Sequence, residues 1–307
     1  MSTRSTQPAA PAPLDPALVD SFKIALTAAR RSRSTLKIYL SSLDRYMQWC
    51  NDNGHPFAID RGQVSAWIAE ILDGGAQPAT AAARLAGVRQ FSKWLTEEDL
   101  LDADPLLRLN APKGDMPVTP VLTDDELRAL IKACTGKSLR DRRDEAIVRL
   151  LAETGLRSAE LLALQTDEVD LSQGLAHVRR GKGGKGRLVP FGPQTARALD
   201  RYIRLRRNHP AAASKALWLG ARTRQPLGPH GLRVALLERA EVAGIKGFHP
   251  HVLRHTFASR WQAARGSDAG LMAVGGWSDR TMLDRYGRVT ASARAAAEAR
   301  ALNLGEL

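Results

Sequence analysis

Cysteine is scarce in this chain, with two residues in 307, Cys50 and Cys134, far apart in the sequence. Each falls on an apolar helical face, which is typical of buried thiols in a reducing compartment. No apolar run approaches the length of a membrane span, and the residues after Met1 lack the apolar segment of a secretory signal. We therefore expect a cytoplasmic protein that has no membrane contact.

Acidic residues are in the minority: 32 Asp and Glu stand against 45 Lys and Arg, which gives a net charge of +13 and a pI near 10.3. The basic residues are interspersed among apolar ones rather than gathered in blocks, so they indicate a folded basic surface. A polyanion is the expected partner of such a surface.

The chain contains no internal repeat and divides into four segments. Residues 1–13 are rich in Ser, Thr, Pro and Ala and are expected to be a disordered tail. Residues 14–110 carry apolar stripes at helical spacing and predict a small all-helical domain. Residues 111–120 hold three prolines and predict a linker, and residues 121–307 form a second domain.

The helical domain carries scattered basic residues. Individually they are typical of solvated surface, but together they could line a wall that faces a nucleic-acid strand. They are Arg30, Arg31, Arg33, Lys37, Arg84, Arg89 and Lys93.

The second domain begins with a capping box, in which Thr123 is followed by Glu126 three residues later. A helix is expected from about Asp144 to Glu153, ending at Gly155. Helix resumes directly afterwards and places Arg157 at a helix N-terminus, where the dipole favours an anion. The alternative is a surface arginine paired with Glu160.

Two short runs rich in apolar residues, 175–179 and 187–191, flank a glycine-rich stretch and predict a β-hairpin. The stretch does not fit a phosphate-binding loop, because Lys185 is followed by Gly186 rather than Ser or Thr. A hairpin that carries Lys182 or Lys185 into a DNA groove is the alternative, since lysine can serve as a proton donor.

Helices are expected over 193–208 and 229–243, and then over a segment that opens with Pro250. In this segment His251 and Arg254 share one helical face and together could hold a phosphate. A partly solvated helix without chemistry is one alternative. A metal site at His251 and His255 is another, but no carboxylate or thiol lies nearby and Arg254 would repel a cation. Further helices are expected over 268–274, 280–286 and 291–304.

In order and spacing, these motifs resemble the tyrosine recombinase (phage integrase) family. The resemblance rests on Thr154-Gly155-Leu156-Arg157, Gly181-Lys182-Gly183, His251-Val252-Leu253-Arg254-His255 and Tyr286. One departure is Gly275-Gly276-Trp277, where many members have Leu-Gly-His. The short N-terminal segment favours a simple type without an arm-binding domain, either Xer-like or an element integrase.

The resemblance implies a mainly α fold with a small β-sheet, in which a helical core-binding (SAM-like) domain over 14–110 and a catalytic domain over 121–307 clamp DNA. It implies a 3′-phosphotyrosine intermediate, formed without metal or nucleotide. The implied site residues are the catalytic Arg157, Lys182, His251, Arg254, Trp277 and Tyr286 and the supporting Glu160, Lys185 and His255.

The implied partners are double-stranded DNA with inverted half-sites and further copies of the chain in a tetramer, with the C-terminal helix as a subunit contact. DNA-bending accessory proteins and a nucleoid location are also expected. The alternatives are a type IB topoisomerase-like enzyme, which nicks and reseals one duplex, and a non-catalytic DNA-binding regulator on the same fold.

Overall fold

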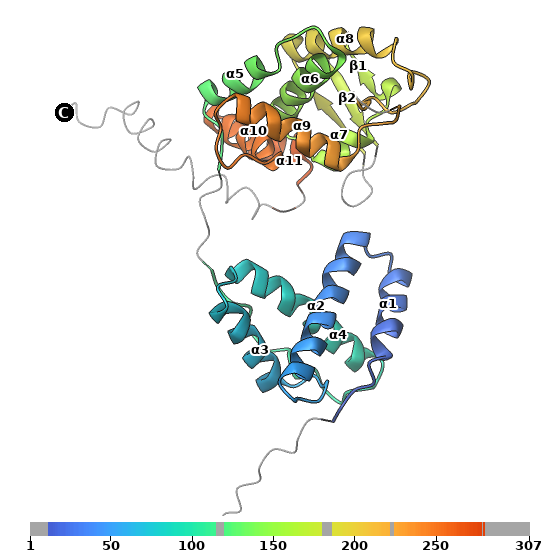
Figure 1. Cartoon of the computed structure of the whole chain (residues 1–307), viewed down its shortest axis with the longest axis vertical. Helices are drawn as coiled ribbons and strands as arrows, with labels where there is room; N and C mark the ends of the chain where they lie inside the picture. The colour runs from blue at the N-terminus through green and yellow to red at the C-terminus, as the bar shows by residue number, and fades with distance from the viewer. Residues whose placement is uncertain (1–11, 115–119, 180–185, 222–223, 278, 280–307) are drawn as a thin grey trace, which may run out of the picture. The chain divides into compact units, whose positions relative to one another are not determined.

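The computed structural model describes residues 12–114, 120–179, 186–221, 224–277 and 279, and the chain forms two compact units, Met1–Met116 and Pro117–Leu307 (Figure 1). Most of the expected tail, Lys182, Lys185, Tyr286 and the helices expected over 280–286 and 291–304 lie outside the described residues. Among the described helices, none is long and apolar enough to cross a membrane.

The N-terminal unit is helical, as predicted, and α2 and α4 form its main packing contact. Gly87 lies at the crossing of these helices, where a Cβ atom would stand 2.6 Å from the Cβ of Ser42. The core is built of buried apolar and aromatic side chains, among them Phe22, Tyr46 and Phe91. The helices are α1 (Leu18–Ala28), α2 (Arg33–Asp52), α3 (Arg61–Asp73) and α4 (Pro78–Glu97).

Local hydrogen bonds explain where helix α3 begins. The Asp60 carboxylate accepts from the Gln63 backbone N–H at 2.8 Å, so Asp60 caps the helix. The Gln63 side chain donates to the Pro56 carbonyl at 2.8 Å and to the Cys50 sulfur at 3.1 Å. Cys50 and Cys134 are both buried free thiols, which confirms that prediction.

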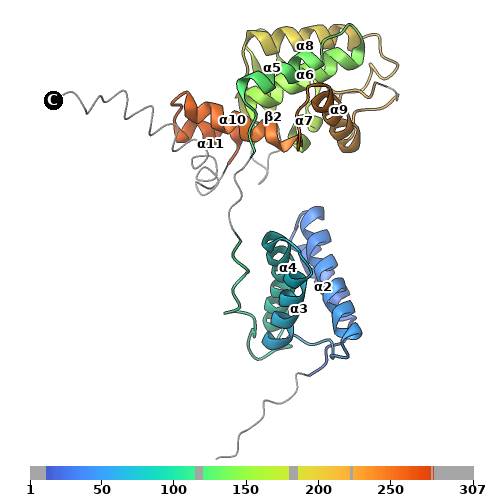
Figure 2. The ribbon, with the colours of Figure 1, turned by 60° about the vertical axis from the view of Figure 1, so that its left-hand side comes forward.

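The C-terminal unit packs its helices around α6, with a small sheet beside them. Figure 2 shows α5, α6 and α8 side by side, and α6 also packs against α10. Its elements are α5 (Asp124–Ala133), α6 (Leu139–Thr154), α7 (Ser158–Ala163), the 3-10 helix η1 (Thr166–Glu168), β1 (Val169–Asp170), β2 (Leu175–Val178), β3 (Arg187–Pro190), α8 (Pro193–Arg206), α9 (Pro229–Val242), α10 (His251–Ala263) and α11 (Asp268–Gly275).

The predicted hairpin is confirmed as β2 and β3, which pair antiparallel with His177 opposite Leu188. A third strand, β1, adds to the other side of β2. It was not predicted, because two residues are too few for an alternating pattern.

The predicted start of helix α6 near Asp144 was wrong. The helix begins at Leu139, where the Ser138 hydroxyl and the Asp141 carboxylate form a capping box. Residues 140–145 are all charged, so this part of the helix shows no apolar stripe at helical spacing. Ser138 and Asp141 nevertheless stand at the spacing of a capping box. The capping box at Thr123 and Glu126 is present as predicted.

Candidate active site

Arg157 occupies the junction between α6 and α7. Gly155 ends α6 with a φ of +62°, and Arg157 is the N-cap residue of α7. Its backbone N–H donates to Oε2 of Glu160 at 2.9 Å, and its Nη1 donates to Oε1 at 2.8 Å. The pairing that the sequence left as an alternative is therefore present.

This Arg157–Glu160 pair is not an ordinary surface ion pair. Glu160 is only 5% exposed, whereas the Arg157 side chain keeps 27% of its surface exposed. The second nitrogen of the Arg157 fork, Nη2, donates to the Gly276 carbonyl at 3.0 Å. Arg157 is thus anchored to Glu160 and to the end of α11, while part of its side chain remains open to solvent.

Arg187 is a member of this cluster that the sequence argument missed. It opens β3, and its Nη1 and Nη2 donate to the two oxygens of Glu160 at 3.0 and 2.8 Å. Its Nε donates to the Val274 carbonyl at 2.8 Å. Its place directly after the glycine-rich stretch was visible in the sequence, but no spacing rule links a strand residue to a helix twenty-seven residues earlier.

The charge of Glu160 is stabilised by these contacts. Burial alone raises the pKa of the carboxyl, but hydrogen bonds from Arg187 and from the Arg157 backbone outweigh it and lower that pKa to about 2. Glu160 is therefore ionised at every pH at which the protein is expected to work.

Arg254 lies at the other side of the same junction. It projects from α10, is 2% exposed, and donates through Nη1 to the Gly155 carbonyl. Its guanidinium carbon lies 4.0 Å from the centroid of the Trp277 ring, a cation–π contact. Trp277 in turn stacks on Phe257 with 6.4 Å between ring centroids and an angle of 14°.

His251 begins α10 and lies in a positive field. The residue as a whole is exposed, but desolvation by the surrounding protein atoms lowers the pKa of its ring, and the charges of Arg254, His249 and Arg157 lower that pKa further. The ring meets His255 edge to face at 4.5 Å between centroids. No cluster of three or more His, Cys, Asp or Glu with metal-binding potential occurs in the described part of the chain.

The structure thus gathers six predicted site residues from α7, α10 and the end of α11. They are Arg157, Glu160, His251, Arg254, His255 and Trp277. Lys182, Lys185 and Tyr286 lie outside the described residues.

Tyr202, the other tyrosine in this half of the chain, is fully buried. Its hydroxyl donates to the Leu217 carbonyl and accepts from the Leu219 N–H, both at 2.9 Å. Burial raises its pKa to about 12, so its phenol is unsuited to act as a nucleophile.

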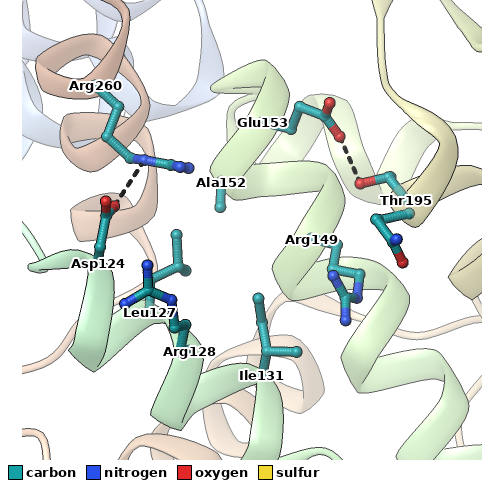
Figure 3. Close-up of a pocket in the computed structure, with 10 residues that line it drawn as sticks. Asp124, Leu127, Arg128, Ile131, Arg149, Ala152, Glu153, Thr195 and Arg260 are labelled. Carbon is teal, nitrogen blue, oxygen red and sulfur yellow. Dashed lines mark hydrogen bonds and ion pairs between the residues drawn. The ribbon is translucent and has the colours of Figure 1, made fainter. Parts of the chain in front are cut away.

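A hollow elsewhere in this unit is separate from the cluster. Figure 3 shows it between α5, α6, α8 and α10, with Arg260 paired to Asp124 and Glu153 bound to Thr195. None of the predicted site residues lines it. The cluster around Arg157 and Arg254 is therefore the better candidate.

Comparison with known proteins agrees with this arrangement. Residues 120–293 match the phage integrase family, and residues 19–99 match the phage integrase N-terminal SAM-like domain. The tyrosine recombinase XerC of Mycobacterium sp. (strain KMS) is 36% identical over 255 residues, which cover 79% of this chain and 84% of that protein.

Several solved structures share the fold, among them two complexes. One is the XerH site-specific recombinase bound to a palindromic difH substrate in a post-cleavage complex, with a TM-score of 0.73, 16% identity, and coverage of 91% of this chain and 83% of that one. The other is a lambda integrase tetramer bound to a Holliday junction, with a TM-score of 0.67, 17% identity, and coverage of 87% and 75%.

The chain belongs to the phage integrase family of tyrosine recombinases. It is an enzyme of site-specific recombination that acts through a tyrosine, so the predicted family, enzyme class and mainly helical fold are confirmed. The topoisomerase-like and regulator alternatives are not favoured.

Proposed function

We propose that this chain cuts and rejoins double-stranded DNA at specific sites, with Tyr286 as the nucleophile and the cluster around Arg157 and Arg254 as the phosphate site. The observation that carries the proposal is the meeting of two fixed arginines where α10 packs against the junction between α6 and α7. Arg254 donates to the Gly155 carbonyl, two residues before Arg157, and His251 begins the helix that carries Arg254. Arg157, His251 and Arg254 belong to α10 and to the N-cap of α7, which are far apart in the sequence.

The arginines supply the charge that the reaction needs. Negative charge develops on the nonbridging oxygens of a phosphodiester during in-line attack, and fixed guanidinium groups stabilise it best when they are already held in place. Arg254 is fixed by the Gly155 carbonyl and the Trp277 ring, and Arg157 by Glu160 and the Gly276 carbonyl. Both can therefore act with little rearrangement.

The cleavage step transfers the phosphoryl group and two protons. The Tyr286 oxygen bonds to phosphorus while the bond to the 5′ oxygen breaks, which leaves a 3′-phosphotyrosine. His251 accepts the phenolic proton, because its lowered pKa keeps it neutral at neutral pH. Lys182 gives a proton to the departing 5′ oxygen, with Lys185 as the alternative donor. Attack by the 5′-hydroxyl of a partner strand reverses the step and releases Tyr286.

The remaining residues support the phosphate site. Glu160 orients Arg157, Trp277 supports Arg254 through its ring, and His255 packs edge to face against His251. The mechanism calls for neither metal nor nucleotide, because the guanidinium groups do the electrostatic work and the phosphotyrosine conserves the energy of the bond. Addition of EDTA should leave cleavage unchanged.

The same proposal assigns residues 14–110 to DNA binding, 111–120 to the linker and 121–307 to catalysis, with 1–13 as a tail. The substrate would carry inverted half-sites, and a tetramer would assemble on it. The fold shared with XerH on a palindromic substrate and with a lambda integrase tetramer supports this. A C-terminal helix as subunit contact, DNA-bending partners and a cytoplasmic, nucleoid-associated location complete the proposal.

Covalent capture tests the chemistry. The protein is incubated with nicked duplexes from DNA flanking its own gene, adducts are trapped under denaturing conditions, and the attached residue is mapped. We expect an adduct on Tyr286, none with Tyr286→Phe, and an undiminished adduct with Tyr202→Phe. Strand exchange between two labelled duplexes separates a recombinase from a topoisomerase-like enzyme, and tight binding without any adduct would support a regulator instead.

A further inference from the structure

Arg187 is the one described arginine of the cluster to which the proposed mechanism gives no role. Its side chain is only 13% exposed and makes three polar contacts, two with Glu160 and one with the Val274 carbonyl. Gly276 passes so close that a Cβ atom there would stand 2.8 Å from the Arg187 guanidinium carbon. With a φ of +66°, Gly276 closes α11 on this guanidinium.

Glu160 is shared between two guanidinium groups. Its Oε1 accepts from Nη1 of both Arg157 and Arg187, and its Oε2 accepts from the Arg157 backbone and from Nη2 of Arg187. The bond from Arg187 is the bidentate fork-to-carboxylate arrangement, whereas Arg157 gives Glu160 only one end of its fork.

The charges of these three groups do not cancel. One carboxylate faces two guanidinium groups, so the trio keeps one positive charge. Since Arg187 is nearly enclosed and Arg157 is 27% exposed, that surplus charge lies on the side where an anion can reach it. Without Arg187 the buried carboxylate would neutralise Arg157 and draw its whole fork away from an incoming phosphate.

We propose that Arg187 is a positioning residue: it neutralises and anchors Glu160, so that the Arg157 charge remains available to the scissile phosphate, and it ties this pair to the end of α11 ahead of Trp277. This inference rests on the proposed function, since it assigns the phosphate to Arg157. It predicts a residue that matters for the rate of cleavage and little for DNA affinity.

The test compares variants in single-turnover cleavage of a nicked duplex at saturating protein. Arg187→Met should cleave about 100-fold more slowly, because a misplaced catalytic group can lose that much rate, while its DNA affinity stays near the wild-type value. Adding Glu160→Gln removes the unbalanced carboxylate, so the double variant should recover to within about 10-fold of wild type. A merely structural role for Arg187 predicts no such rescue.

Arg179 offers a matched control on the opposite strand of the same hairpin. It follows β2, and its Nε lies 2.5 Å from the carboxylate of Glu168, another buried glutamate, but it contacts none of the site residues in the described structure. Arg179→Met should cleave like wild type at a temperature where both are folded. An equal loss in Arg179→Met and Arg187→Met would overturn the proposal, because it would point to damage of the hairpin as a whole.

A substrate with a 5′-bridging sulfur separates Arg187 from the proton donor. A thiolate leaves without a proton, so this substrate should restore cleavage by Lys182→Ala and leave Arg187→Met slow. If this substrate restored cleavage by Arg187→Met, Arg187 would be assigned to proton delivery and the proposal would be overturned. In the earlier comparison, the proposal would also be overturned if the double variant cleaved no faster than Arg187→Met.

Two further arms keep the test decisive. If Arg187→Met is too unstable to assay, Arg187→Lys replaces it. The charge remains but the fork of the guanidinium is lost, which predicts cleavage about 10-fold slower than in wild type. An unchanged rate would overturn the proposal.

The adduct on Tyr286 is mapped in wild type beforehand. Its absence there would refute the proposed function itself, independently of any result on Arg187.

Discussion

The N-terminal unit buries aromatic rings, whereas the C-terminal unit buries charges. In the first, Phe22 meets Phe91 at 5.3 Å and Tyr46 meets Trp67 at 5.1 Å between ring centroids. Its described buried polar residues are Ser42, Gln63 and Ser92, none of which is ionisable. In the part of the second unit that the structure describes, the buried charged residues are Arg143, Asp144, Glu145, Glu160, Glu168, Arg206 and Arg254.

The difference follows from what each unit is proposed to do. Burial of aromatic rings stabilises a fold strongly but places no charge at a defined point. Buried ion pairs add little net stability, because desolvation offsets their attraction, yet each one fixes the direction of a guanidinium or carboxylate. A platform that presents surface charge to a DNA backbone needs only the first kind of core, and a phosphate site needs the second.

The largest expected effect removes a ring from the first core. Phe91 is fully buried against Phe22 and Trp94, and Phe91→Ala should lower the free energy of unfolding by about 3–5 kcal/mol. Urea unfolding measures the loss, and Ile24→Ala, at a position 71% exposed, is the control with a change within about 0.5 kcal/mol. A small loss in Phe91→Ala would mean that the rings do not carry this core.

The next effect concerns two buried arginines of the second unit. Arg254→Met should slow cleavage about 10²- to 10³-fold, the usual loss for one fixed donor to a developing oxyanion. Arg206 is buried to a similar degree, but it donates to the carbonyls of Ala212, Ser214, Ala216 and Leu217. Arg206→Met should therefore lower stability and spare the cleavage rate. Equal rates for the two variants would remove the distinction between catalytic and structural buried charge.

A third prediction concerns acid stability. The pKa of Glu160 is about 2 in the folded protein against an ordinary value of 4.5, so its ionised form stabilises the fold above pH 4.5, and this contribution disappears as the pH falls toward 2. The contribution at pH 7 is on the order of 3 kcal/mol. Between pH 6 and pH 2, the free energy of unfolding should decline less steeply for Glu160→Gln than for wild type. Parallel curves for the two proteins would contradict the lowered pKa of Glu160.

The smallest effect concerns the surface of the first unit. Arg84 donates to the Ser41 hydroxyl at 2.9 Å and makes no ion pair in the described structure, whereas Lys93 is paired with Glu97 at 3.5 Å. If Arg84 contacts a DNA phosphate, Arg84→Ala should change the salt dependence of DNA binding. The slope of the logarithm of the binding constant against the logarithm of the salt concentration should become smaller in magnitude by about 1. Lys93→Ala should change the slope less, and cleavage at saturating DNA should stay the same in both.

The sequence singled out most of the residues that the structure brings together in the candidate site. The hairpin, the helix that carries His251 and Arg254 and the N-terminal place of Arg157 all rest on local rules, namely alternation, helical spacing and a glycine that ends a helix. Local rules could not predict that Arg187 belongs to the cluster, because its partners Glu160 and Val274 lie in α7 and α11, far from it in the sequence.

The amino-acid sequence by itself determined the two-part organisation, the helical elements and the types of group that the chemistry requires, because these follow from periodicity, capping and charge along neighbouring residues. Only the tertiary structure decided that Glu160 serves two arginines, that Arg254 lies on the Trp277 ring, and that Tyr202 is enclosed. Such contacts join residues far apart in the chain, and no local pattern encodes which buried charge will meet which partner.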